Sequence, residues 1–178
     1  LEGGPQERRE ALWQVAALER DSGSLFAGTR PTPQSSPLPE LSPLETTLAD
    51  YRLAGLTTGP HLLAHWRQEL DERGVVSAQG LCEVRDGQFV RTAGHVIVRQ
   101  RPGSAKGFCF LTLEDETGTS NAVLTPNLYE RFRIELQTAA VVELAGCVQN
   151  VDDVIHVRVQ HLWALEPRGT LPPSHDYR

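Results

Sequence analysis

Between residues 42 and 74 apolar side chains recur every three or four positions, which is the period of an amphipathic helix. Ser42 and Glu45 have the spacing of a capping box, and Pro43 suits the first helical position. A helix is therefore expected over about Leu44–Leu53. A second helix is expected between Gly59 and Gly74, with these residues on its apolar face: Leu62, Leu63, Trp66 and Leu70.

Beyond Gly80 the spacing of apolar residues falls to two, which predicts strands. A helix opened by proline is expected over Pro126–Ile134, between the third and fourth strands. The order strand, strand, strand, helix, strand, strand predicts a mainly β chain with a five-stranded OB-fold barrel, preceded by a small helical region. The five expected strands are Gln88–Arg101, Gly107–Glu114, Thr119–Thr125, Ala139–Gln149 and Val154–Leu162.

The distribution of proline, serine and glycine divides the chain into five parts. Residues 1–20 hold a short amphipathic segment, Arg8–Glu19, and are expected to be the end of a truncated helical region. Low apolar content predicts a flexible linker over 21–41. The remaining parts are a helical pair at 42–80, the OB-fold domain at 88–164 and a proline-rich tail at 165–178.

Composition limits the function classes. The 178 residues carry a formal net charge of -6, which argues against coating of duplex DNA, so any nucleic-acid site must be local. Three cysteines at irregular spacing predict reduced thiols and neither a disulfide framework nor a metal site. No apolar stretch is long enough to span a membrane, and no secretion signal is present, so a cytoplasmic location is expected. The absence of methionine predicts a fragment of a longer protein.

Positive charge gathers in one part of the predicted barrel. Residues 87–113 hold four cations and no acidic residue: Arg91, Arg99, Arg101 and Lys106. The loop Arg101–Gly107 contains two glycines, which would let backbone N–H groups and two cations approach a phosphate. The alternative is a solvated hairpin without a ligand.

The second predicted strand alternates in a way that suggests an aromatic surface. Cys109, Leu111 and Leu113 are uniformly apolar and should face the barrel interior. The other parity would then present Phe108, Phe110 and Thr112 outward, and bases could stack on the two rings. Asn121, on the third strand, could hydrogen-bond a base edge. The alternative is that one or both phenylalanines pack in the core.

No residue pattern indicates catalysis. Glu114-Asp115-Glu116 enters a turn and its members alternate between faces, so a structural hairpin is favoured over two-metal chemistry. His61 and His65 are four residues apart but lack a partner motif for metal binding. No phosphate-binding glycine loop and no nucleophile elbow is present.

The amino-acid sequence itself, and not only its pattern of apolar and polar positions, resembles a known family. Residues 92–118 (TAGHVIVRQRPGSAKGFCFLTLEDETG) look like the OB region near the C-terminus of bacterial C-family DNA polymerases, the relatives of the DNA polymerase III alpha subunit. In that family successive helices before the OB-fold begin at residues that resemble Asp50-Tyr51, Gly55-Leu56 and His61 of this chain. The end of the helix-hairpin-helix region resembles Arg9–Trp13. Val154–Val157 matches the final strand. The similarity is greater to the error-prone branch than to the replicative one.

The resemblance implies a parent DNA-directed DNA polymerase whose catalytic aspartates and Mg lie in a palm domain upstream. This fragment is thus expected to be neither an enzyme nor the holder of a cofactor. A more distant similarity to the anticodon-binding OB domains of aminoacyl-tRNA synthetases implies base contacts by Phe110 and Asn121. The leading expectation is a single-stranded DNA-binding module of an error-prone polymerase acting in damage-induced mutagenesis and translesion synthesis. The alternative is a protein-docking module that recruits a sliding clamp or another mutagenesis protein through the helical pair, Trp66 and the tail.

Overall fold

The computed structural model describes residues 13, 15, 41–54, 56–151, 154–165 and 175–177. The chain divides into two compact units, Leu1–Thr46 and Thr47–Arg178. Of the helix expected over Arg8–Glu19, only Trp13 and Val15 are described, and both are helical. The linker expected at 21–41 lies outside the described residues, except for its last position.

The first described helix, α2 (Pro43–Ala54), begins where the capping box predicts. Ser42 N–H donates to Glu45 Oε2 at 2.8 Å, and Glu45 N–H donates to Ser42 Oγ at 3.2 Å. Each side chain therefore satisfies an N–H group that has no partner within the helix. The predicted start of this helix is confirmed.

The second predicted helix is wrong in one respect, because the chain forms two short helices in its place. A 3-10 helix, η1 (Leu62–His65), is followed by α3 (Arg67–Glu72), and Trp66 between them has non-helical φ and ψ of -117° and 0°. Leu62, Leu63 and Leu70 are buried as expected. Gly74 ends the segment with φ +70°, a value that favours glycine.

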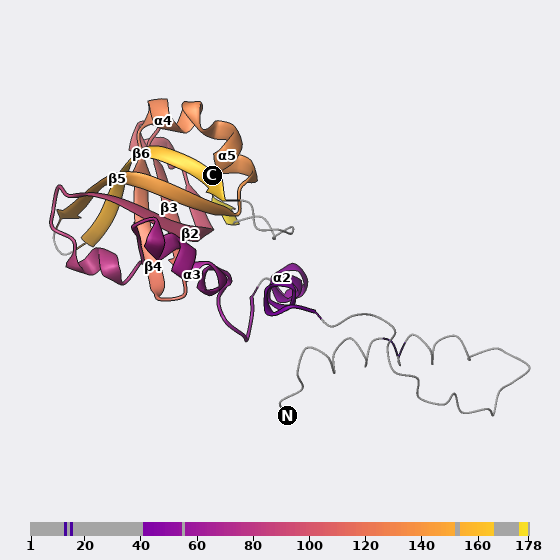
Figure 1. The fold of residues 1–178 in the computed structure, drawn as a ribbon. Helices are drawn as coiled ribbons and strands as arrows, with labels where there is room; N and C mark the ends of the chain where they lie inside the picture. Colours follow the sequence, from indigo (N-terminus) through magenta and orange to yellow (C-terminus); the bar gives the residue numbers. More distant parts are fainter. Residues whose placement is uncertain are drawn as a thin grey trace, which may run out of the picture. The chain divides into compact units, whose positions relative to one another are not determined.

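Five strands close into a ring through their hydrogen bonds, and Figure 1 labels these strands. Hydrogen bonding runs in the order β2, β3, β4, β6, β5 and back to β2, and the β4–β6 pair is parallel. This is the predicted OB-fold order, and each observed strand overlaps its prediction. The strands are β2 (Phe89–Gln100), β3 (Cys109–Asp115), β4 (Gly118–Leu124), β5 (Val141–Val151) and β6 (Val154–Leu165).

Strand β2 serves both halves of the ring because it bends beside Gly94. Its first half pairs with β5 over Phe89–His95, and its second half pairs with β3 over His95–Gln100. A Cβ atom on Gly94 would lie 2.6 Å from the Cβ of Leu113, so the close approach requires glycine. The predicted bend at this position is confirmed.

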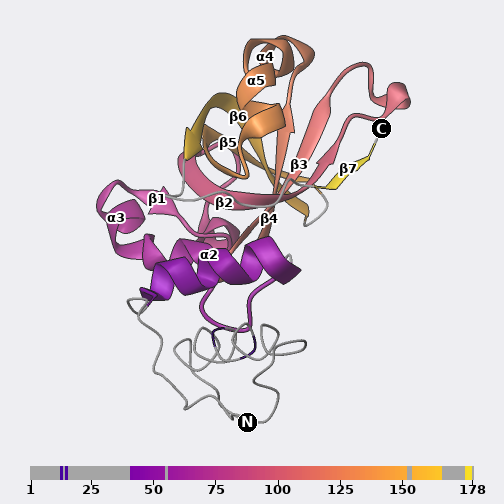
Figure 2. The same ribbon diagram turned by 90° about the vertical axis from the view of Figure 1, so that its right-hand side faces the viewer.

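One end of the barrel is covered by two short helices, α4 (Pro126–Arg131) and α5 (Arg133–Thr138), in both views of Figures 1 and 2. They replace the single helix expected over Pro126–Ile134, and Phe132 interrupts them with φ -106°. Leu136 of α5 enters the core. The core consists of Leu81, Val90, Val96, Cys109, Leu111, Leu113, Ala122, Leu124, Leu136, Val142, Leu144, Val148, Val157, Val159 and Leu162.

Two strands extend the sheet beyond the sequence prediction. Strand β1 (Val75–Val76) pairs in parallel with Arg91 and Thr92 of β2. Strand β7 (His175–Tyr177), in the segment expected as a tail, pairs in parallel with residues 98–100 of β2. Among the residues described, no helix has the length and apolar character needed to cross a membrane.

Gly146 marks an irregularity between β5 and β6, and its replacement is expected to be costly. The register shifts between Ala145 and Gly146, and a Cβ on Gly146 would lie 2.1 Å from the carbonyl oxygen of Arg158. Because a backbone atom cannot rotate away, Gly146→Ala should lower the free energy of unfolding by about 1–3 kcal/mol in urea titrations. Gly103→Ala is the control, since nothing lies within 4 Å of its Cβ position. Equal stability of the two variants would contradict this assignment.

Candidate nucleic-acid interface

Two phenylalanines point outward at the start of β3, as the alternation predicts. Phe108 and Phe110 are 37% and 39% exposed, whereas Cys109, Leu111 and Leu113 are buried. An exposed phenylalanine costs hydration free energy that an apolar ligand surface would recover. The exposure of Phe108 and Phe110 confirms the predicted outward orientation of both rings.

Phe110 belongs to a row of residues that crosses all five strands of the ring on the outer surface of the barrel. Directly paired residues of neighbouring strands point to the same face. The row runs from Gln100 through Phe110 and Val123 to Arg158 and Cys147, each member paired with the next. It places an aromatic ring, an apolar side chain and an exposed guanidinium side by side.

A second row, two residues further along β3, carries hydrogen-bonding groups. It runs from Thr112 through Asn121 and His156 to Gln149. Thr112 Oγ1 donates to Asn121 Oδ1 at 3.2 Å, which leaves the amide nitrogen of Asn121 as a donor. His156 Nε2 lies 3.2 Å from Gln149 Oε1, and because an amide oxygen accepts, Nε2 carries the donated hydrogen. The two rows together are called the strand face.

The loop between β2 and β3 brings one of its two cations to the edge of this face. Lys106 is exposed, adopts a left-handed conformation with φ 50°, and forms no ion pair within the described ranges. Arg101 is already engaged: its guanidinium lies 4.3 Å from the centre of the Tyr129 ring and 3.4 Å from Glu130 Oε1. Lys106 is thus the cation of this loop that a phosphate would meet first.

The structure does not bring Arg99 to the surface, contrary to the sequence expectation. Arg99 is only 8% exposed and pairs with Leu111, an interior residue of β3. The reason is a bulge between Val96 and Val98, which shifts the register by one residue and exchanges the two faces of the strand. Val98 and Gln100 therefore point outward, whereas strict alternation along β2 would have turned Arg99 outward.

Arg91 lies away from the strand face and is held by an acidic partner. Its Nε donates to Glu143 Oε1 at 2.7 Å, and Arg73 pairs with the other oxygen of the same fully buried carboxylate. The Arg91 guanidinium also stacks 5.4 Å from the centre of the Trp163 ring. This arrangement offsets the buried charge of Glu143, so Arg91 has a structural role and is not part of the candidate interface.

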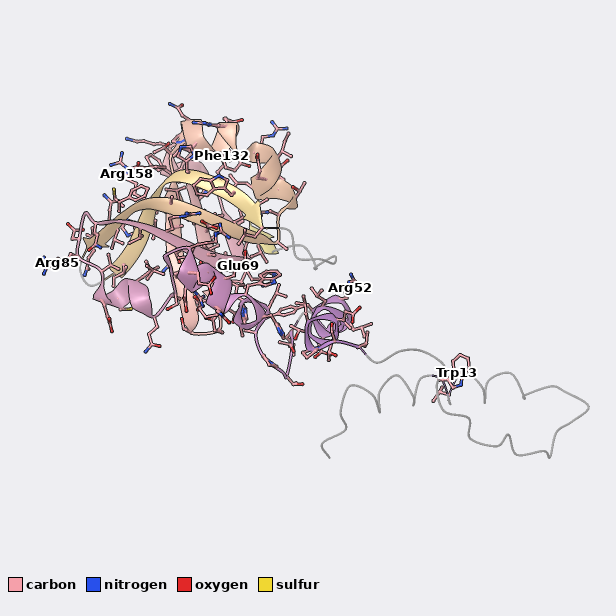
Figure 3. All side chains as sticks on the ribbon, in the orientation of Figure 1. Trp13, Arg52, Glu69, Arg85, Phe132 and Arg158 are labelled. Atoms are coloured by element: carbon pink, nitrogen blue, oxygen red, sulfur yellow. The ribbon has the colours of Figure 1, made fainter. Side chains whose placement is uncertain are left out.

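Sequence reasoning missed Arg158, the exposed cation in the middle of the Phe110 row. Figure 3 labels it at the barrel surface on the side of α4. The signal was available, because Val157 and Val159 are buried and alternation then turns Arg158 outward. Arg158 lies outside the cluster of cations on the first strand and its loop, in which the sequence concentrates positive charge. Arg158 also borders a surface hollow of about 510 Å³ with Thr125, Leu128 and Cys147.

The acidic turn does not have the arrangement of a metal site. Asp115 points inward and accepts hydrogen bonds from the N–H groups of Ala78, Thr117 and Gly118, which confirms a structural hairpin. His65 is bonded to Thr47 at 3.0 Å. No group of three or more His, Cys, Asp or Glu side chains in the described part of the chain could hold a metal ion.

The chain is similar to a known domain family and to parts of several solved structures. Residues 90–165 match the tRNA anti-codon family, described as an OB-fold nucleic acid binding domain. The asparaginyl-tRNA synthetase of Pyrococcus horikoshii is 27% identical with a TM-score of 0.45, over 53% of this chain and 24% of that chain. The aspartyl-tRNA synthetase of Entamoeba histolytica is 12% identical with a TM-score of 0.41, over 49% and 20%.

Curated relatives cover nearly the whole chain. The error-prone DNA polymerases of Nocardia farcinica and Anaeromyxobacter dehalogenans are each 40% identical, over 96% and 97% of this chain and 15% of each relative. Error-prone DNA polymerase 2 of Agrobacterium fabrum is 37% identical over 89% of this chain and 16% of its own length. The chain thus spans about 15% of the length of these relatives. It is homologous to the C-terminal region of bacterial error-prone DNA polymerases and carries an OB-fold nucleic acid binding domain.

Proposed function

We propose that this chain is the single-stranded DNA-binding module of an error-prone DNA polymerase, acting in damage-induced mutagenesis and translesion synthesis. The single-stranded DNA lies across the strand face. Its bases stack on Phe110, and the amide of Asn121 hydrogen-bonds a base edge. Arg158 and Lys106 neutralise phosphates beside it. The observation that carries the proposal is the row that joins exposed Phe110 to exposed Arg158 across paired strands.

The chemistry of the face favours a single strand over a duplex. Each base has an aromatic surface that can stack on a phenylalanine, and in a duplex both surfaces are already covered by neighbours. The few free cations suit a ligand held by stacking with modest phosphate attraction, consistent with the net charge of -6. Nucleotide addition would be performed by another part of the parent polymerase, and this module would guide template to it without reacting itself.

The test is binding of a fluorescent oligo-dT of about 20 nucleotides to the whole chain, followed by anisotropy at low salt. Stacking on an aromatic side chain contributes about 1–3 kcal/mol per base, so Phe110→Ala should weaken binding by about 5- to 150-fold. Arg158→Ala should weaken binding less and reduce the slope of log affinity against log salt by about 0.7. Both effects follow if the strand lies along the Phe110 row.

Two matched variants control this experiment. Trp163→Ala removes an aromatic ring of similar exposure, 43%, that contacts Arg91 outside the strand face. Arg52→Ala removes an exposed cation from α2. Both should bind as the unaltered chain does. Absence of binding by a folded unaltered chain would contradict the proposal and favour the protein-docking role, in which a clamp or another mutagenesis protein occupies this module.

A further inference from the structure

A second concave site lies beside the strand face, where the helical segment meets β2 and β3. It is a pocket of about 220 Å³, called here the histidine pocket, whose polar and aromatic walls are Tyr51, Thr57, His61, His95 and Glu114. His95 pairs with Glu114 across β2 and β3, and Glu114 pairs with Thr119 of β4. The pocket therefore opens one row beyond Thr112 and Asn121, about 7 Å further along the strand.

The two histidines present ring nitrogens that no described residue satisfies. His95 is 7% exposed, and both of its ring nitrogens are buried without a hydrogen-bond partner among the described residues. His61 Nδ1 accepts from Leu63 N–H at 3.1 Å, so the hydrogen sits on Nε2, which is also buried and without a described partner. Buried polar groups are nearly always hydrogen-bonded, and such exceptions need a ligand or another explanation.

Burial favours the neutral form of both imidazoles. Burial lowers the pKa of His95 to about 4, with the neighbouring His61 adding to the effect. Burial likewise lowers the pKa of His61, although the nearby carboxylate of Glu114 acts in the opposite direction. A neutral imidazole has one donor and one acceptor in the plane of its ring. The pocket wall thus carries imidazole donors and acceptors without positive charge.

Charge and shape define the ligand that fits. Glu114 places a carboxylate at the wall and repels phosphate, while it attracts groups that carry N–H donors. Tyr51 packs edge-on against His95 and His61, with ring centres 5.4 Å and 6.2 Å apart, and provides an aromatic wall. The volume is below the range of about 300–1,000 Å³ for drug-sized ligands and suits one planar heterocycle.

We propose that the histidine pocket receives one nucleobase swung out of a single strand that lies on the strand face, and that it prefers a base with an exocyclic amino group. Glu114 accepts hydrogen bonds from that amino group, and His61 and His95 meet the remaining edge of the base. Guanine, cytosine and adenine carry such a group, whereas thymine does not. The proposal rests on the proposed function, because the strand face delivers the base.

Anisotropy of four labelled oligomers tests this preference: dT12, and dT12 with a single central dG, dC or dA. A charge-assisted hydrogen bond predicts that the whole chain binds at least one substituted oligomer about fivefold or more tighter than dT12. His95→Phe should abolish this preference, and Glu114→Gln should reduce it because a neutral amide oxygen is a weaker acceptor than a carboxylate; both should leave dT12 affinity within about twofold. His161→Phe, at an exposed histidine stacked on Trp163, should retain it.

Nitrogen-15 NMR of the histidine rings provides a readout that is independent of DNA binding. Added deoxyguanosine or deoxycytidine should shift the His61 and His95 signals, and thymidine should not. Binding of all four oligomers with equal affinity and no nucleoside shift would overturn the pocket and leave the proposed function standing. Nucleoside shifts without oligomer binding would overturn the proposed function and support the pocket as a free nucleoside site. Absence of both would overturn both.

Discussion

Replacement of Asp115 by alanine is expected to lower the free energy of unfolding by about 3–5 kcal/mol, measured by urea titration with circular dichroism. The carboxylate is 1% exposed and pairs with Arg67 Nη2 at 3.3 Å. It also accepts from the N–H of Ala78 at 2.7 Å and from Thr117 N–H and Oγ1 at 2.7 Å and 2.6 Å. Removing it leaves the buried N–H of Ala78 and the part-buried donors of Thr117 without this acceptor, and Arg67 keeps only its contacts with Asp71 and Glu116 as described carboxylate partners.

Asp71 provides a matched control, because it pairs with the same Arg67 at 3.5 Å but is 62% exposed. Asp71→Ala should cost less than about 1 kcal/mol, as surface ion pairs do. Asp115→Asn should be nearly as damaging as Asp115→Ala, since its amide N–H₂ would face donors. If Asp115→Ala stays within 1 kcal/mol of the unaltered chain, Asp115 does not fasten α3 and the β1 segment to the β3–β4 hairpin.

Alternation was a reliable guide wherever a strand runs without interruption. Cys109, Leu111 and Leu113 could be assigned to the interior because three apolar side chains of one parity have no other place to go. The outward position of Phe110 follows from the same reasoning. The capping box at Ser42 was also visible, because both members of the interaction lie within one turn.

Sequence patterns did not predict the position of a side chain where that position depends on a residue distant in sequence. Arg99 is buried because a bulge between Val96 and Val98 exchanges the faces of β2, and a bulge depends on the pairing with β3. Arg91 is paired with Glu143, 52 residues away. The interruption at Trp66 similarly precedes Arg67, which bonds to Glu116 across 49 residues. The sequence within a few residues of Arg67, Arg91 and Arg99 does not distinguish these side chains from solvent-exposed ones.

The histidine pocket is a further case of this kind. Its walls come from α2, the segment between α2 and η1, β2 and β3, so no local motif contains its donors and acceptors. His61 was noticed for its spacing from His65, yet its partner in space is Tyr51, and His65 bonds to Thr47. The function of these side chains follows only from the tertiary contacts that bring them together.

Stability should fall as the pH is lowered from about 6.5 to about 4, with His95 contributing about 3 kcal/mol to the loss. Burial lowers the pKa of His95 to about 4 in the folded chain, against 6.5 in the unfolded chain. Between these values the unfolded state binds a proton that the folded state does not, so unfolding becomes more favourable as the pH falls. The full stability is present above pH 6.5, where His95 is neutral in both states.

The difference between the unaltered chain and His95→Phe isolates this effect from the carboxylates that titrate in the same range. Tyr51, His61 and Glu114 face His95 in the pocket and are retained in the variant. In urea titrations at several pH values, His95→Phe should be at least as stable at pH 7.5, because it removes a buried group that has no described hydrogen-bond partner. Its advantage should then grow by about 3 kcal/mol on the way to pH 4. An advantage that does not change with pH would mean that His95 titrates alike in both states, and that the imidazole is not held neutral for a base to bind.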